Sequence, residues 1–127
     1  MSPFHLALVA LAGAIGATCR HLVGLAVMRA LGPGFPWGTF AVNVSGSLIM
    51  GLFIGLWALK VSGPEEIRLF VAVGVLGGFT TFSSFSLDAV TLYERGALLP
   101  AAGYVAGSVL LSLAALFAGL AIARTFA

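Results

Sequence analysis

Charged residues are scarce in this sequence of 127 amino acids. Lysine and arginine together number six, and aspartate and glutamate four, so that only 8% of the residues are charged. A soluble domain averages about 25%, and a disordered chain has few apolar residues. Both classes are therefore excluded. Because 61% of the residues are hydrophobic and the mean hydropathy is +1.15, the composition predicts an integral membrane protein.

Other scarcities exclude further functions. The net charge is only +2 and no basic cluster is present, so we expect no nucleic-acid partner. The single cysteine, Cys19, allows no internal disulfide and no CxxC metal site, and we expect it to pack in an apolar stretch. Two histidines, one cysteine and four carboxylates also supply no nucleophile–base pair or metal-ligand cluster, so we do not expect an enzyme.

Four apolar stretches are each long enough for a membrane-spanning helix, which needs about 20 residues. They cover residues 4–31, 37–59, 67–93 and 97–123. Short connections with Gly and Pro separate them. The N-terminus has no basic n-region of a signal peptide, so we expect the first stretch to be retained. The sequence therefore predicts one all-α transmembrane domain over residues 1–127.

Small residues recur four positions apart, as in Gly103/Gly107 and Ala115/Gly119. This spacing is typical of close contacts between membrane helices, either within one subunit or between two.

Basic residues divide almost evenly between the two sides of such a four-span chain. One side has Lys60, Arg68 and Arg124, and the other has Arg29 and Arg95, plus Arg20 if its side chain extends outward. The positive-inside rule then gives almost no bias. Two interpretations stay open: a single, weakly specified orientation, or insertion in both orientations. The second would allow an antiparallel homodimer about a twofold axis in the membrane plane.

Two of the stretches carry polar residues four positions apart, along one side of each helix. They are Thr39, Asn43 and Ser47 in the second stretch, and Tyr104, Ser108 and Ser112 in the fourth. Such residues either join helices by hydrogen bonds or line a wetted path. Asn43 favours the path, because its amide has two N–H donors and a carbonyl to satisfy.

The third stretch holds the densest polar segment, residues 77–86, which opens with Gly77 and Gly78. Adjacent glycines favour a break in the helix. Gly77 lies about 12 Å along the helix from Leu69, near the membrane midplane. A break would free backbone carbonyls, and two copies meeting at an in-plane axis would form a cage for a hard cation. We therefore predict a third helix broken near the midplane.

Aromatic and hydroxyl residues alternate after the glycines, at a spacing of three. The columns are Phe79, Phe82 and Phe85; Thr80, Ser83 and Ser86; and Thr81 and Ser84, followed by Asp88. Positive ring edges, an amide and hydroxyls would hold a small anion weakly enough to release it. The alternative is that the rings only pack. Arg20, well inside the first span, either extends to the interface or draws anions into a vestibule.

Three segments resemble the signature sequences of the Fluc fluoride-channel family (CrcB proteins). They are GAIGATCR at residues 13–20, GTFAVNVSG at 38–46 and GGFTTFSSF at 77–85. The resemblance extends over essentially the whole chain. It implies a dual-topology, antiparallel homodimer of four-helix subunits in the bacterial plasma membrane. It also implies passive fluoride export through two antiparallel pores, and a structural Na⁺ at the dimer interface.

The resemblance further implies roles for individual residues. Phe82 and Phe85 would offer ring edges to fluoride, and Asn43 would donate to the ion. The remaining positions implied along the pore are Thr39, Ser83, Ser84, Asp88, Tyr104, Ser108 and Ser112. The backbone carbonyls of Gly77 and Thr80 match the family's Na⁺ site.

Two other functions remain as alternatives. A small dual-topology multidrug exporter would also be a four-span dimer, but it depends on a carboxylate in the first helix. The first stretch here contains neither Asp nor Glu. A non-conducting assembly subunit would use the polar stripes only to join helices, so changing them would affect stability and not flux.

Overall fold

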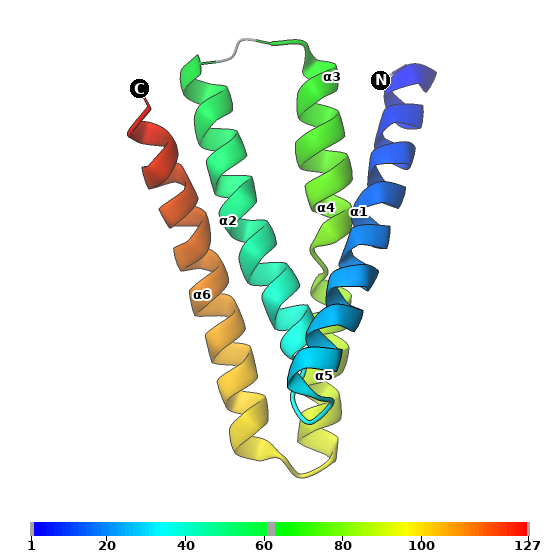
Figure 1. The fold of residues 1–127 in the computed structure, drawn as a ribbon, viewed down its shortest axis with the longest axis vertical. Helices are drawn as coiled ribbons and strands as arrows, with labels where there is room; N and C mark the ends of the chain where they lie inside the picture. Colours follow the sequence, from blue (N-terminus) through cyan, green and yellow to red (C-terminus); the bar gives the residue numbers. More distant parts are fainter. Residues whose placement is uncertain (1, 61–62, 127) are drawn as a thin grey trace.

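The computed structural model describes residues 2–60 and 63–126, and these residues form helices joined by short links. The elements are α1 (Pro3–Leu31), α2 (Trp37–Lys60), α3 (Glu65–Arg68), the π-helix η1 (Leu69–Leu76), α4 (Gly77–Phe79), α5 (Phe82–Glu94) and α6 (Leu98–Arg124). Four helical stretches are long and apolar enough to cross a membrane, with α3 to α5 together making the third. Figure 1 shows how these stretches are arranged in the bundle. The predicted all-helical, four-span architecture is confirmed.

Local chemistry explains how the first helix begins and ends. Ser2 caps α1, because its hydroxyl accepts the amide hydrogen of His5, and Pro3 occupies the first helical position, where its missing N–H costs nothing. At the other end Gly32 has a φ of 83°, which glycine adopts without strain. The N–H of Gly32 donates to the carbonyl of Met28 over 2.7 Å, so the helix ends there.

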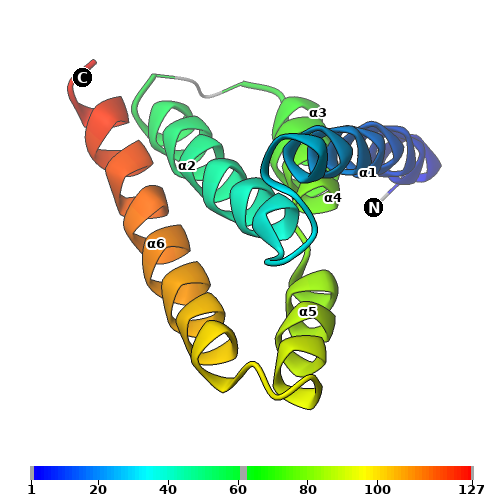
Figure 2. The same ribbon diagram turned by 60° about the horizontal axis from the view of Figure 1, so that its bottom comes forward.

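Two helix pairs make the bundle. In Figures 1 and 2, α6 runs beside α2, and α1 runs beside the upper part of the third span, η1 and α4. Glycines allow these backbones to approach closely. A Cβ added at Gly119 would lie 2.5 Å from the Leu52 nitrogen of α2, and one added at Gly78 would lie 2.7 Å from the Gly13 carbonyl oxygen of α1.

The third span changes its backbone conformation halfway along. η1 is a π-helix, and Thr80 and Thr81 are extended, with φ, ψ of −78°, 155° and −151°, 115°. In Figure 1 the chain narrows to a short link between α4 and α5. We expected Gly77 and Gly78 to interrupt the helix, but both are helical. Gly78 instead serves the close contact with α1.

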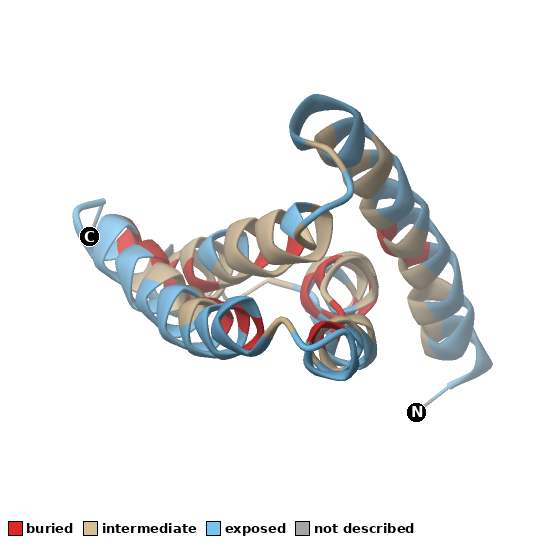
Figure 3. Cartoon of the chain, turned by 90° about the horizontal axis from the view of Figure 1, so that it is seen from below, coloured by how far each residue is buried: buried red, intermediate tan, exposed pale blue. Residues whose placement is uncertain are grey.

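The single chain buries little of its apolar surface. Figure 3 shows buried residues only on the inward sides of the helices. One buried cluster joins α5 to α6 and consists of Phe85, Leu92, Ala101 and Tyr104. Large apolar residues elsewhere face outward, among them Leu99 and Phe82. Outward apolar side chains are expected where lipid or another protein subunit replaces water.

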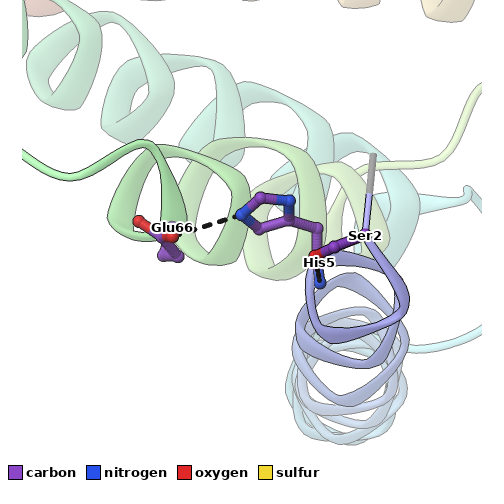
Figure 4. A network of polar contacts seen from close by, with 3 residues as sticks. All are labelled: Ser2, His5 and Glu66. Atoms are coloured by element: carbon purple, nitrogen blue, oxygen red, sulfur yellow. Dashed lines mark hydrogen bonds and ion pairs between the residues drawn. The ribbon is translucent and has the colours of Figure 1, made fainter.

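Each end of the bundle has its own polar contact. Near the N-terminus, His5 Nε2 lies 3.2 Å from Glu66 Oε1, which joins α1 to α3 (Figure 4). At the opposite end, the Arg95 guanidinium donates to the carbonyl of Gly34 over 3.4 Å, which joins the end of α5 to the link between α1 and α2. The two ends of the subunit are therefore chemically different.

Candidate functional site

Asn43 of α2 holds the extended link between α4 and α5. Its Nδ2 donates to the Thr81 carbonyl over 3.0 Å, and its Oδ1 accepts the Thr81 N–H over 2.7 Å. Both polar atoms of the amide thus bind one backbone unit 38 positions away. Since Nδ2 carries two hydrogens, one remains for another partner. The predicted need of Asn43 for polar partners is met by the link itself.

Thr81 begins α5. Its hydroxyl oxygen accepts the amide hydrogen of Ser84 over 3.2 Å, the usual arrangement at a helix N-cap, and lies 3.3 Å from Ser83 Oγ. Because its oxygen accepts from the Ser84 amide, its own hydrogen is free to be donated to Ser83 or to a bound group. The Thr81 side chain is almost fully buried.

A vestibule of about 590 Å³ opens at the end of the bundle where α1 joins α2. We use this name for the cavity lined by Arg20, Thr39, Thr81, Ser84 and Asp88, with neighbouring parts of α1, α2 and α5. The Nε of Arg20 is buried and has no hydrogen-bond partner among the described residues. Arg20 therefore lines a cavity that contains hydroxyls and one carboxylate.

A second cavity, of about 420 Å³, lies on the other side of the link. We call it the cleft. Its polar lining is Asn43, Ser47, Thr80, Thr81, Ser108 and Ser112, and its aromatic lining is Phe82 and Phe85. The hydroxyl of Ser108 is buried without a hydrogen-bond partner in the described structure. The cleft thus brings together five of the nine residues expected along the pore or against the ion: Asn43, Phe82, Phe85, Ser108 and Ser112.

The other four expected residues do not line the cleft. The hydroxyl oxygen of Ser83 lies 3.3 Å from that of Thr81. Thr39 and Ser84 line the vestibule. Tyr104 lines neither of these two cavities and is fully buried, with its ring centroid 5.3 Å from that of Phe85. The Tyr104 hydroxyl donates to Asp88 Oδ2 over 3.1 Å. Tyr104 therefore connects the carboxylate of the vestibule to the aromatic ring of the cleft.

Thr81 is the one described residue that lines both the vestibule and the cleft. The spacing of the hydroxyl residues in the sequence puts Thr81 in one of their columns and indicates no separate role for it. The available signal was its position directly before the helical run, three residues ahead of Ser84. The contact between its backbone and Asn43 could not be predicted from the sequence, because no spacing rule joins residues so far apart.

Backbone carbonyls near the link have lost their helical donors, and those of Gly77 and Thr80 are among them. In a continuous α-helix the N–H of residue i donates to the carbonyl of residue i−4. Thr81 N–H would then serve Gly77, and Ser84 N–H would serve Thr80. Instead the first donates to Asn43 Oδ1 and the second to Thr81 Oγ1. These are the two carbonyls predicted as cation ligands, and backbone carbonyls are ligands that hard cations accept.

The fold and these cavities define a small multi-pass membrane protein with a polar interior on both sides of an interrupted span. The chain matches the family model described as "CrcB-like protein, Camphor Resistance (CrcB)" over residues 7–120, and it belongs to that family.

Similar proteins carry an explicit functional name. A protein of Agrobacterium fabrum named fluoride-specific ion channel FluC is 58% identical over 94% of this chain and 96% of its own length. Proteins of the same name from Mesorhizobium japonicum and a Chelativorans species are 55% and 58% identical, each over 96% of this chain and 98% of the relative.

Proposed function

We propose that this protein is a fluoride-selective channel that lets fluoride leave the bacterial cell passively across the plasma membrane. The observation that carries the proposal is the meeting of two polar cavities at Thr81, beside Asn43 and Phe85. The named relatives, at up to 58% identity over most of the chain, support the choice of ion.

The cleft offers the hydrogen-bond chemistry that a small anion requires. Fluoride is strongly hydrated, so a passage must replace water with donors at short range. The free hydrogen of Asn43, the Ser108 hydroxyl and the positive edges of Phe82 and Phe85 are such donors. None of the described residues that line the cleft is a lysine or an arginine. Binding without a full positive charge leaves the ion free to move on.

The working assembly in this proposal is an antiparallel homodimer with dual topology. The Phe82 ring is 77% exposed on the single chain, although it lies 5.5 Å from the Phe85 ring beside a polar cleft. A second copy would cover it and close the cleft. The nearly even distribution of basic residues allows that copy to insert in the opposite orientation.

The interrupted span would hold a structural Na⁺ at the dimer interface. Thr80 and Thr81 lie halfway along the span Glu65–Glu94, so in this proposal they would lie near the middle of the membrane. Gly77 is exposed on the single chain. The carbonyls of Gly77 and Thr80, doubled by the second copy, would give four oxygen ligands without a carboxylate. That set suits a monovalent cation better than a divalent one.

Arg20 would make the vestibule attractive to anions. Its partly buried guanidinium lines this cavity, whereas Asp88, held by the Tyr104 hydroxyl, is the one carboxylate in the lining. Attraction at the mouth and weaker neutral donors further in would raise the local anion concentration without trapping the ion.

The two alternatives fit less well. A multidrug exporter would need a carboxylate in its first helix, and α1 has none. A subunit with a purely structural role would satisfy its polar groups between helices, but Ser108 Oγ is buried, faces the cleft and has no partner among the described residues.

Anion efflux from liposomes tests the proposal. Purified protein is reconstituted into vesicles loaded with potassium fluoride or potassium chloride, and valinomycin starts the efflux. We expect fluoride to be released rapidly. Chloride should leave no faster than it leaves protein-free vesicles. Equal rates for both anions would refute selectivity, and no release of either anion would favour the structural subunit.

A further inference from the structure

We infer that the side chains of Asn43 and Thr81 create the cation site, by capturing the two amide hydrogens that would otherwise occupy its carbonyls. This inference rests on the proposed Na⁺ site and concerns how the chain keeps that site available. Neither side chain is a cation ligand here. Both act through the backbone, so they are positioning residues.

Asn43 keeps the Gly77 carbonyl free of a hydrogen bond from the Thr81 N–H. Thr81 N–H donates to Asn43 Oδ1 over 2.7 Å, and the amide is held in place by its second bond, from Nδ2 to the Thr81 carbonyl. With both bonds made, Thr81 stays extended and its N–H cannot turn back toward Gly77. A side chain without an oxygen at position 43 would leave a buried amide hydrogen unpaired, which favours its return to the Gly77 carbonyl.

Thr81 controls the Thr80 carbonyl in the same manner. Its hydroxyl takes the Ser84 amide hydrogen, which a continuous helix would give to Thr80. Thr80 then keeps its extended ψ of 155° and stays outside α5, which begins after the N-cap Thr81. One amide and one hydroxyl thus hold two carbonyls open within a single turn of the chain.

The arrangement connects the cation site to the anion path. Asn43 lines the cleft, and Thr81 lines both cavities, so the groups that face the path are those that shape the cation site. Any change that lets the span close into a continuous helix would alter the cation site and the anion path at once.

The test measures Na⁺ binding without using flux. Thermal unfolding of the purified protein is followed in detergent while sodium replaces N-methyl-D-glucamine at constant ionic strength. We expect sodium to raise the Tm of the wild type. In Thr81→Val and Asn43→Leu, the sodium concentration that gives half of the Tm rise should increase at least tenfold.

Two matched variants separate positioning from a general loss of hydroxyls. Thr81→Ser keeps the capping oxygen and should retain the response of the wild type. Ser86→Ala removes a hydroxyl of the same helix whose one hydrogen bond within residues 2–60 and 63–126 is to the Phe82 carbonyl, and it should also respond normally. Asn43→Leu leaves the cap of α5 intact, so it gives an answer even if Thr81→Val folds poorly.

Failure of the inference and failure of the proposed site look different. A wild-type Tm that does not respond to sodium would overturn both the site and this inference. A normal sodium response in Thr81→Val and Asn43→Leu would keep the site and overturn the role of these side chains.

Discussion

Gly119 is the position where a single methyl group should reveal how tightly the helices pack. A Cβ placed there would lie 2.5 Å from the Leu52 nitrogen and 2.9 Å from the Gly51 carbonyl carbon, and also against the Leu48 oxygen. Ordinary contacts between such atoms are about 3.5 Å or longer. The obstacle is backbone, which cannot rotate away, so α2 and α6 would have to separate by about 1 Å.

The expected cost follows from two opposing terms. Overpacking of this kind costs about 1–3 kcal/mol, while replacing glycine by alanine inside a helix gains about 1 kcal/mol. Gly103, on the same helix, has nothing within 4 Å of an added Cβ and experiences only the gain. The free energy of unfolding of Gly119→Ala should therefore be about 1–3 kcal/mol lower than that of Gly103→Ala.

Equilibrium unfolding by SDS in mixed micelles, followed by tryptophan fluorescence, measures this difference. The comparison of two alanines on one helix cancels the propensity term. If both variants are at least as stable as the wild type, the close packing of α2 on α6 is refuted. If both are less stable than the wild type by the same amount, a second subunit packs against Gly103.

Three further predictions concern transport and assembly. Phe82→Ile and Phe85→Ile keep an apolar side chain but remove the ring edge, so fluoride flux per folded dimer should fall by at least about 100-fold, equivalent to roughly 3 kcal/mol; unchanged flux would show that the rings only pack. The reversal potential of the fluoride current should not move when a sodium gradient is imposed, whereas a shift would indicate symport. A tag after Ala127 should be accessible on both faces of membrane vesicles, and protection of nearly all tags on one face would exclude dual topology.

The spans were predictable because membrane helices need long apolar stretches. The predicted stretch 97–123 differs from α6 (Leu98–Arg124) by a single residue at each end.

The sequence predicted which polar residues share one side of a helix, but not which cavity each of them lines. Thr39 and Asn43 lie four positions apart on α2, yet Thr39 lines the vestibule and Asn43 the cleft, because the link at Thr81 separates the two. The spacing of residues shows which side of a helix they share. It does not show that a segment from another part of the chain separates that side into two cavities.

The position of the interruption illustrates the same limit. Glycines permit many backbone conformations, so Gly77 and Gly78 were reasonable candidates. In the fold their small size matters more, since Gly78 contacts the α1 backbone. Thr80 and Thr81 take the extended conformation, which β-branched residues favour, and Asn43 fixes it from another helix. That partner lies 38 positions away, beyond any local pattern.

The unlike ends of the subunit have a consequence for the direction of ion flow. One end carries the His5–Glu66 contact, and the other carries the Arg95–Gly34 contact and the vestibule. A single subunit would therefore present different chemistry to the two aqueous compartments, as in a rectifier. In the proposed antiparallel pair, each compartment would meet one end of each kind. The assembly would conduct equally in both directions, and the fluoride gradient and the membrane voltage alone would decide which way the ion moves.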